Sequence, residues 1–183
     1  ELNVSQAPVR EAILELAAQG MLEERPYSGH FVRQLTAEEI EDIFQIRAVV
    51  EEYAAQLASS RVTDQQLGEM EQVLREMDEN QDLERFVHLD MDFHGLVMDA
   101  AGSPALKRAW KMLRMAEWTY IAAAITKSTL SEMIQQHWTI FRYLENRQGH
   151  SAGAYIYLHI KGFGDEVSQH FAGQEDSTGP DDK

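Results

Sequence analysis

Hydrophobic residues recur at helical spacing along most of the chain, beginning with residues 5–20. Val9 and Ile13 lie on one side of this first segment. Ser5 suits an N-cap, and Pro8 falls in the first turn, where proline's missing N–H does no harm. Gly20 then interrupts the pattern. These signals predict a helix over residues 5–20.

Two short extended stretches follow, over residues 21–25 and 30–34. They are joined by Pro26-Tyr27-Ser28-Gly29, a run typical of a hairpin turn. A helix followed at once by a small hairpin is a helix-plus-wing arrangement. Residues 1–35 are therefore predicted to be part of a winged-helix domain.

The pattern changes at residue 36, after which only helical spacing is found. Thr36 and Glu39 form a capping-box sequence that opens a helix running to about residue 61. Turn and cap signals divide the rest into five more helices, over about 63–79, 82–101, 103–125, 128–147 and 151–171.

The predicted fold is therefore mainly α. A partial winged helix-turn-helix, consisting of one helix and a two-stranded wing, precedes an antiparallel bundle of six to seven helices over residues 36–172. Residues 173–183 are polar and are predicted to be a disordered tail.

Composition narrows the function classes. The chain has 183 residues, 44% of them hydrophobic, and no cysteine, which excludes disulfides and thiolate metal sites and favours a cytoplasmic protein. No apolar run approaches the roughly 18 residues that a membrane span needs, and the first residues lack the features of a signal peptide. No membrane partner is expected.

The net charge of the whole chain, −15, disfavours binding to DNA. Its distribution is uneven, because residues 1–35 contain three arginines against five glutamates, a net −2, and the other −13 lies in residues 36–183. An acidic domain is compatible with a DNA-binding module that alone contacts the duplex.

One carboxylate and several histidines fall at positions that suit a metal site. Asp90 and His94 are four residues apart and share a helix face. His137 and His159 fall in the middle of the fifth and sixth predicted helices. Helices of a bundle can direct such side chains to one point, and imidazole with carboxylate suits zinc, nickel, iron or manganese.

Spacing alone leaves alternatives open for this site. An Asp–His pair four residues apart is also common as an ordinary surface contact. His88 and Asp92 have the same spacing but lie on another stripe, since His88 is roughly 240° around the helix from His94.

Two stretches resemble the GntR family of transcriptional regulators. The first matches the family's recognition helix and wing through Ser5, Pro8-Val9-Arg10-Glu11-Ala12, Leu16, Gly20 and Gly29. The second, residues 36–171, resembles the FCD effector domain of the FadR-type subfamily, with Asp90-Met91-Asp92-Phe93-His94 as its Asp-x-x-Phe-His motif. The resemblance also implies that two helices precede the recognition helix in the intact protein.

The resemblance selects Asp90 over Asp92 and implies a divalent metal, with zinc as the first choice. The implied ligands are Asp90, His94, His137 and His159.

The same resemblance assigns a DNA-binding surface. The recognition helix is expected in the major groove, with Arg10 on a phosphate or guanine and Ser5 on a phosphate. Gln6 departs from the arginine of many relatives and suits adenine instead. Gly29 and His30 form the wing tip, which in the family probes the minor groove.

Arg47 interrupts an apolar stripe of the helix that begins at Thr36. The resemblance makes it a carboxylate-binding residue of the metal pocket, for which a guanidinium is chemically suited. The alternative is an internal ion pair with Glu51, four residues on along the same face.

The implied function is a metabolite-responsive repressor, not an enzyme. A homodimer binds a palindromic operator, and a small organic acid releases it. One alternative is a regulator that senses the metal itself. Another is a metal-dependent hydrolase, which is disfavoured because no glutamate or histidine has an evident role as general base.

Overall fold

Helices dominate the computed structural model, which describes residues 5–18, 22–33, 35–113 and 115–175. Contacts divide the chain into two compact units, residues 1–35 and 36–183. The predicted mainly α fold with one small hairpin is confirmed.

The first unit contains helix α1 (Gln6–Ala18) and an antiparallel hairpin of β1 (Leu22–Arg25) and β2 (Gly29–Val32). In the turn, the Ser28 N–H donates to the Arg25 carbonyl at 3.0 Å. Gly29 has φ 93°, a backbone conformation that favours glycine. Strand β2 begins one residue earlier than predicted, and the predicted ends at Gly20, Met21 and Gln34 lie outside the described residues.

Seven helices make up the described part of the second unit. They are α2 (Ala37–Arg61), α3 (Asp64–Glu79), α4 (Leu83–Ala100), α5 (Pro104–Met112), α6 (Met115–Ile125), α7 (Leu130–Glu145) and α8 (Gly149–Glu175). The predicted capping box of α2 is confirmed, because the Glu39 N–H donates to Thr36 Oγ1 at 3.2 Å and the Thr36 N–H donates to Glu39 Oε2 at 3.0 Å. The last helix extends beyond the predicted end at residue 171.

The prediction of one helix over residues 103–125 is wrong. The segment forms α5 and α6, with α5 ending at Leu113, whose N–H donates to the Trp110 carbonyl three residues back at 3.1 Å. On a single helix Trp110 and Thr119, nine residues apart, would point in opposite directions. The break lets both side chains reach the same part of α2, where each forms a hydrogen bond.

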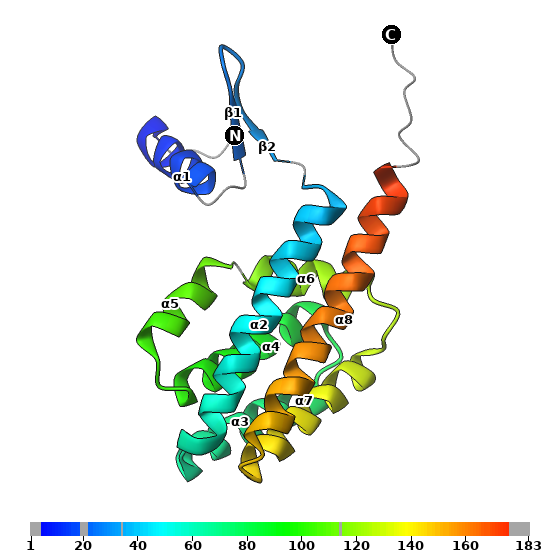
Figure 1. The fold of residues 1–183 in the computed structure, drawn as a ribbon. Helices are drawn as coiled ribbons and strands as arrows, with labels where there is room; N and C mark the ends of the chain where they lie inside the picture. Colours follow the sequence, from blue (N-terminus) through cyan, green and yellow to red (C-terminus); the bar gives the residue numbers. More distant parts are fainter. Residues whose placement is uncertain (1–4, 19–21, 34, 114, 176–183) are drawn as a thin grey trace. The chain divides into compact units, whose positions relative to one another are not determined.

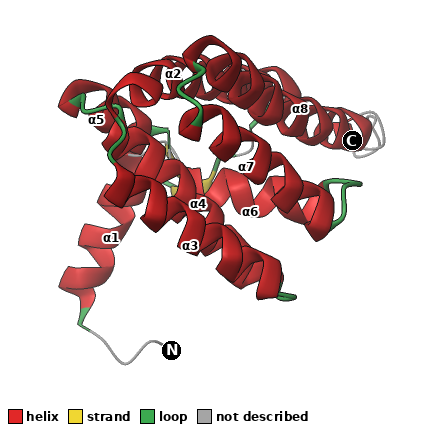
Figure 2. Cartoon of the chain, turned by 90° about the horizontal axis from the view of Figure 1, so that it is seen from below, coloured by secondary structure: helices red, strands yellow, loops and turns green. Residues whose placement is uncertain are grey.

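The two longest helices, α2 and α8, lie side by side and antiparallel (Figure 1). A Cβ at Gly164 of α8 would overlap the Phe44 side chain, so glycine permits their close approach. One turn further along α8, at the same end of the pair, the Ser168 hydroxyl donates to the Ala37 carbonyl at 3.0 Å. Helices α3, α4, α6 and α7 lie on one side of this pair (Figure 2).

Half of the residues of helix α4 are buried, among them two polar residues. Its buried residues are Phe86, Val87, Leu89, Asp90, Phe93, His94, Val97, Met98 and Ala100. Two polar side chains, Asp90 and His94, are thus enclosed in an otherwise apolar helix face, where each needs a partner.

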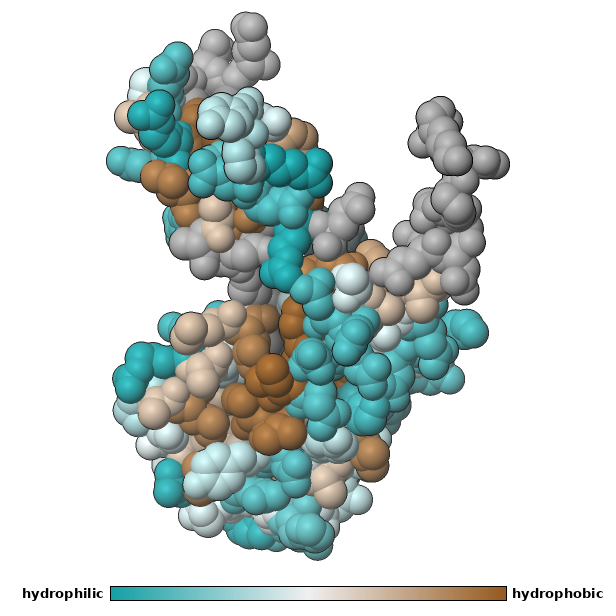
Figure 3. Space-filling view, turned by 45° about the horizontal axis from the view of Figure 1, so that its top comes forward, coloured by the Kyte–Doolittle hydropathy of each residue, from teal (hydrophilic) through white to brown (hydrophobic). Residues whose placement is uncertain are grey.

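Hydrophobic surface is also present on this second unit (Figure 3). Along α2, Ile46, Val49 and Tyr53 are 53%, 50% and 55% exposed. Their spacing of three and four residues places them on one stripe of the helix. Within the described residues, no helix is both long and apolar enough to cross a membrane.

Candidate metal centre

Asp90, His94, His137 and His159, the four residues predicted as metal ligands, are brought together by the structure. They come from α4, α7 and α8, and one ligand atom from each lies within 4.8 Å of the others. His137 Nε2 lies 2.9 Å from Asp90 Oδ1, and His94 Nε2 lies 3.8 Å from the same oxygen. All four residues are buried.

Aromatic rings surround the cluster and exclude water from it. The ring of His137 has its centroid 5.3 Å from that of Phe93 and 6.1 Å from that of Phe86. His159 has its ring centroid 5.1 Å from that of Phe163. In such low-dielectric surroundings, attraction between a cation and a carboxylate is stronger than in water.

The competing pair on α4 has a different environment. His88 and Asp92 are both exposed, whereas Asp90 and His94 are buried. Burial therefore distinguishes the two pairs, which the four-residue spacing could not do.

Each clustered histidine has an acceptor for its other ring nitrogen. The Nδ1 contacts are His94 with Glu51 Oε2, His137 with the Met133 carbonyl at 2.8 Å, and His159 with Gln136 Oε1 at 2.6 Å. Metal-ligating histidines usually donate their second N–H in this way, which fixes the tautomer. A ring with its proton on Nδ1 and none on Nε2 would offer the Nε2 lone pair to a metal, so His137 would give up its Nε2 contact with Asp90 on binding one.

Two buried polar atoms of the cluster lack a hydrogen-bond partner among the described residues. They are Asp90 Oδ2 and His94 Nε2. Unsatisfied groups of this kind are rare in protein interiors and often mark an ion site. A divalent cation would accept electron pairs from both, and one carboxylate with three imidazoles suits zinc. The residues present therefore fit a metal.

The charge states of Asp90 and His159 suit a cation. Burial alone would lower the pKa of His94, but the charges of Glu51 and Asp90 raise it, so a cation would displace a proton from this ring. Burial alone would raise the pKa of Asp90, but the His94 charge and a hydrogen bond from His137 hold it below its usual range. Burial, together with the charges of His137 and His94, lowers the pKa of His159 well below 6.5. Asp90 is thus ionised and His159 neutral at neutral pH, as metal ligation requires.

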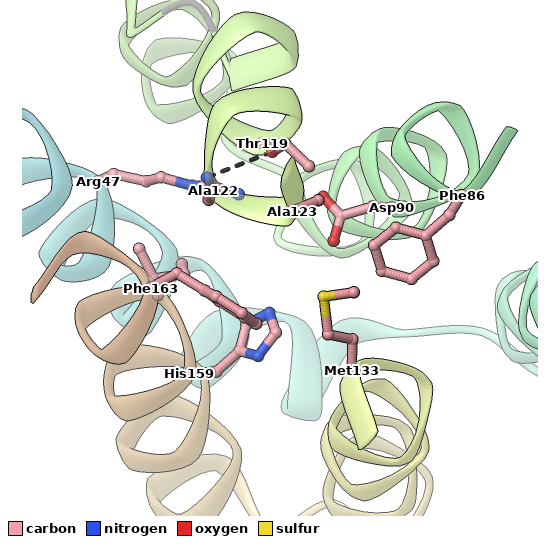
Figure 4. A pocket seen from close by; sticks show the side chains of 10 residues that line it. Arg47, Phe86, Asp90, Thr119, Ala122, Ala123, Met133, His159 and Phe163 are labelled. Carbon is pink, nitrogen blue, oxygen red and sulfur yellow. Dashed lines mark hydrogen bonds between the residues drawn. The ribbon is translucent and has the colours of Figure 1, made fainter. Parts of the chain in front are cut away.

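Arg47 forms the internal ion pair considered from the sequence and also lines the pocket, while its role toward a carboxylate stays a prediction. Its Nε donates to Glu51 Oε1 at 3.0 Å, so the internal ion pair exists. Its Nη1 also donates to Thr119 Oγ1 at 3.3 Å, and the side chain lines the same pocket as Asp90 and His159 (Figure 4).

A small pocket lies beside the cluster, lined in part by Arg47, Asp90 and His159. Its remaining lining is mainly apolar, from Phe86, Ala122, Ala123, Met133, Ile160 and Phe163, with Thr119 as a further polar group. Apolar walls with a few convergent polar groups are typical of a site for a small ligand.

Glu51 has a wider role than the sequence indicated. Sequence reasoning considered it only as a partner for Arg47, yet it contacts His94 and accepts a hydrogen bond from Trp110 Nε1 at 2.9 Å. Burial alone would raise the pKa of Glu51, but the charges of His94 and Arg47 lower it to about 2. The sequence signal that could have indicated this role is the position of the Glu51 carboxylate among apolar residues of α2. Gln136, the acceptor for His159, carried no comparable signal.

The five predicted DNA-binding residues are found at exposed positions of the first unit. Ser5 directly precedes α1, and Gln6 and Arg10 lie in its N-terminal half. Gly29 and His30 begin β2 at the turn of the hairpin. Within the described residues the Arg10 side chain has no hydrogen bond or ion pair, so it is available to a ligand.

Comparisons with known proteins identify the family. Residues 42–162, more than half of the chain, match the family model of the FCD domain. A probable D-xylose utilization operon transcriptional repressor of Paenarthrobacter nicotinovorans is 34% identical over 148 residues, covering 79% of this chain and 65% of that protein. The Nta operon transcriptional regulator of Aminobacter aminovorans is 28% identical over 173 residues, covering 91% and 80%. The chain thus spans less than two thirds of the first relative.

Solved structures show the same fold. Escherichia coli McbR/YncC aligns with a TM-score of 0.77 at 23% identity, covering 93% of this chain and 83% of that one. A GntR family member from Pseudomonas syringae pv. tomato aligns with a TM-score of 0.70 at 21% identity, covering 95% and 74%. The predicted resemblance is confirmed, and the chain belongs to the GntR family of transcriptional regulators, with an FCD domain.

Proposed function

We propose that this protein is a metabolite-responsive repressor whose FCD domain binds a divalent metal through Asp90, His94, His137 and His159. The observation that carries the proposal is the convergence of four buried ligands where Asp90 Oδ2 and His94 Nε2 have no partner within the described residues. Leaving such groups unsatisfied costs about 1–3 kcal/mol each, and more when they are charged. Zinc is the first choice for these donors, and nickel, manganese and iron are alternatives.

The effector is a small carboxylate that occupies the pocket beside the cluster. When bound, the metal supplies a Lewis-acidic position for an anionic oxygen. Arg47, held by Glu51 and Thr119, directs positive charge into the same pocket. A guanidinium pairs well with carboxylates, and the apolar lining favours a compact acid over a highly charged one.

Operator DNA is bound by the first unit. The exposed N-terminal half of α1, with Ser5, Gln6 and Arg10, supports insertion into the major groove. Gly29 and His30 at the hairpin turn support a wing contact. The relatives named as a repressor and a regulator of operons support this assignment.

The acting form is a homodimer on a palindromic operator. Support comes from the exposed stripe of Ile46, Val49 and Tyr53 on α2, an apolar surface that a second copy would cover. Release of DNA requires that the acid bind one arrangement of the dimer better than the other.

One alternative has an observation in its favour. Four protein ligands close a tetrahedral zinc shell, as in structural sites, whereas sites with an open position usually have three. This favours a regulator that senses the metal itself. The hydrolase alternative is excluded by the family, whose relatives are transcriptional regulators.

The double variant His137→Ala/His159→Ala tests the metal site. Elemental analysis of the purified parent is expected to show one metal ion per chain, and the variant should contain none while circular dichroism shows an unchanged helix content. The matched control replaces the exposed histidines, His88→Ala/His150→Ala, and should retain the metal. Equal metal content in parent and double variant would show that the site is wrong.

A second experiment separates the effector from the metal as signal. The protein is dialysed against a chelator, and operator binding is then titrated with zinc and with small organic acids. Release of DNA by acids only when metal is present supports the proposal. Control by zinc alone supports the metal sensor.

A further inference from the structure

Glu51 joins side chains from three other positions in the bundle. Its Oε1 accepts hydrogen bonds from Arg47 Nε at 3.0 Å and from Trp110 Nε1 at 2.9 Å. Its Oε2 contacts His94 Nδ1. The residue is 1% exposed, so water does not compete for these contacts. One oxygen therefore faces a proposed metal ligand, and the other faces α5 and the pocket arginine.

Helix α5 is attached to α2 in part through this carboxylate, and its Lys107 also forms an ion pair with Asp99 of α4. All nine residues of α5 are described, and Trp110, 6% exposed, is the only buried one among them. Its indole ring packs against Gly95 of α4. The single indole N–H is donated to Glu51, so the position of α5 is tied to the orientation of that carboxylate.

The two oxygens of a carboxylate belong to one planar group and cannot move independently. When His94 binds a metal through Nε2, its ring is set by the metal on one side and by Glu51 on the other. Any rotation of the His94 ring therefore turns the Glu51 carboxylate, and with it the oxygen that holds Trp110.

On the basis of the metal site proposed above, we propose that Glu51 is a positioning residue that couples metal binding at His94 to the position of α5 through Trp110. Coupling of this kind is reciprocal, so metal changes the surroundings of Trp110, and changes at Trp110 alter the metal affinity.

Fluorescence provides a direct test, because the chain has only three tryptophans. Replacing Trp118 and Trp138 with phenylalanine leaves Trp110 as the only emitter. Zinc titration of this metal-depleted protein is expected to shift the Trp110 emission and to saturate at one zinc ion per chain. Zinc binding with no change in emission would overturn the coupling, although the metal site would stand. Absence of zinc binding in the parent would overturn both proposals.

The variant Glu51→Gln separates positioning from packing. An amide keeps the size of the side chain but replaces one acceptor oxygen with a donor, so it cannot serve both His94 and Trp110. Zinc affinity, measured by competition with a chromophoric chelator, is expected to fall about 10–100-fold. In the single-tryptophan background, the emission shift should be lost even at saturating zinc. Equal affinity and an unchanged shift would overturn the proposal.

Two further variants make the result specific. Glu52→Gln changes the neighbouring carboxylate of α2, which is only partly buried, and should leave zinc affinity unchanged. Trp110→Phe keeps an aromatic ring but removes the N–H, and reciprocity predicts a lower zinc affinity than in the parent. This variant keeps the test decisive if Glu51→Gln does not fold. An affinity equal to that of the parent would show that α5 is not coupled to the site.

Discussion

The proposed metal centre and the proposed DNA-binding surface differ in burial. Asp90 and His94 are buried, and each retains an atom with no hydrogen-bond partner in the described part of the chain, which supports a cation at this position. Arg10 and Gln6 are exposed, where water satisfies any polar group. Unsatisfied polar atoms can therefore indicate the chemistry of a ligand at a buried site, but not at an exposed surface.

The two regions also differ in charge. The first unit carries a net −2 and the second carries −13. Duplex DNA is repelled by an acidic surface, so contact with an operator is expected to be confined to the first unit. A substitution in the first unit is therefore expected to change operator binding directly, whereas one in the second unit would change it only through the response to metal or effector.

The largest expected effect is stabilisation of the FCD domain by zinc. A ligand that binds only the folded state stabilises it by about 2.7 kcal/mol at one hundred times its Kd. For a domain of this size, the corresponding rise in Tm is roughly 5–10 °C. Calorimetry of metal-depleted protein with and without zinc measures it. His137→Ala/His159→Ala should show no rise, and a rise equal to that of the parent would contradict the site.

The next largest effect is expected on operator binding by the first unit, for which Arg10 is a proposed contact. Arg10→Ala in the intact protein is expected to weaken operator binding by about 1–3 kcal/mol if the guanidinium reads a base, and to reduce the salt slope by about one if it contacts a phosphate. Fluorescence anisotropy at several salt concentrations distinguishes these cases. Zinc content should not change. Unaltered operator affinity at every salt concentration would refute the role of Arg10.

The contribution of Glu51 to the free energy of unfolding is expected to depend on pH. Burial raises the pKa of Glu51, but the charges of His94 and Arg47 lower it to about 2, below its value in the unfolded chain. Such a group stabilises the fold above about pH 4.5, and this contribution is lost as pH falls toward 2. In metal-free protein, the unfolding free energies of parent and Glu51→Gln should therefore converge by up to about 1.4 kcal/mol per pH unit.

Urea unfolding at several pH values between about 5 and 3 measures this convergence. A difference between parent and Glu51→Gln that stays constant across the series would contradict the ion pairs assigned to Glu51.

The smallest effect is expected at Asp92, the carboxylate of α4 that the sequence offered as an alternative to Asp90. Asp92 is exposed, so Asp92→Asn should change the free energy of unfolding by less than about 0.5 kcal/mol and leave zinc binding intact. Asp90→Asn, only two residues away, should lose the metal. Equal zinc contents in the two variants would remove the distinction between the buried and exposed stripes of the helix.

Much of the fold could be predicted because its signals are local. Thr36 and Glu39 are three residues apart, and their capping box formed as predicted. The break between α5 and α6 was missed because its cause is not local. Trp110 and Thr119 form hydrogen bonds with residues that are 59 and 72 positions away in the sequence. A short sequence segment does not contain both members of such a pair.

The same difference between local and distant sequence relations applies to the candidate site. Asp90 and His94 could be paired by spacing on one helix, whereas His137 and His159 were chosen through the family resemblance, because nothing in a single sequence relates residues on separate helices. Glu51 was missed as a partner of His94 since 43 positions separate them.

X-ray absorption at the zinc edge of the zinc-loaded protein tests the central claim most directly. The account predicts one zinc ion per chain with three imidazole nitrogens at about 2.0–2.1 Å and one carboxylate oxygen at about 2.0–2.2 Å. In His137→Ala/His159→Ala, the bound zinc and its imidazole signal should be absent. A spectrum with fewer than three imidazoles in the parent, or an unchanged spectrum in the variant, would contradict the metal centre.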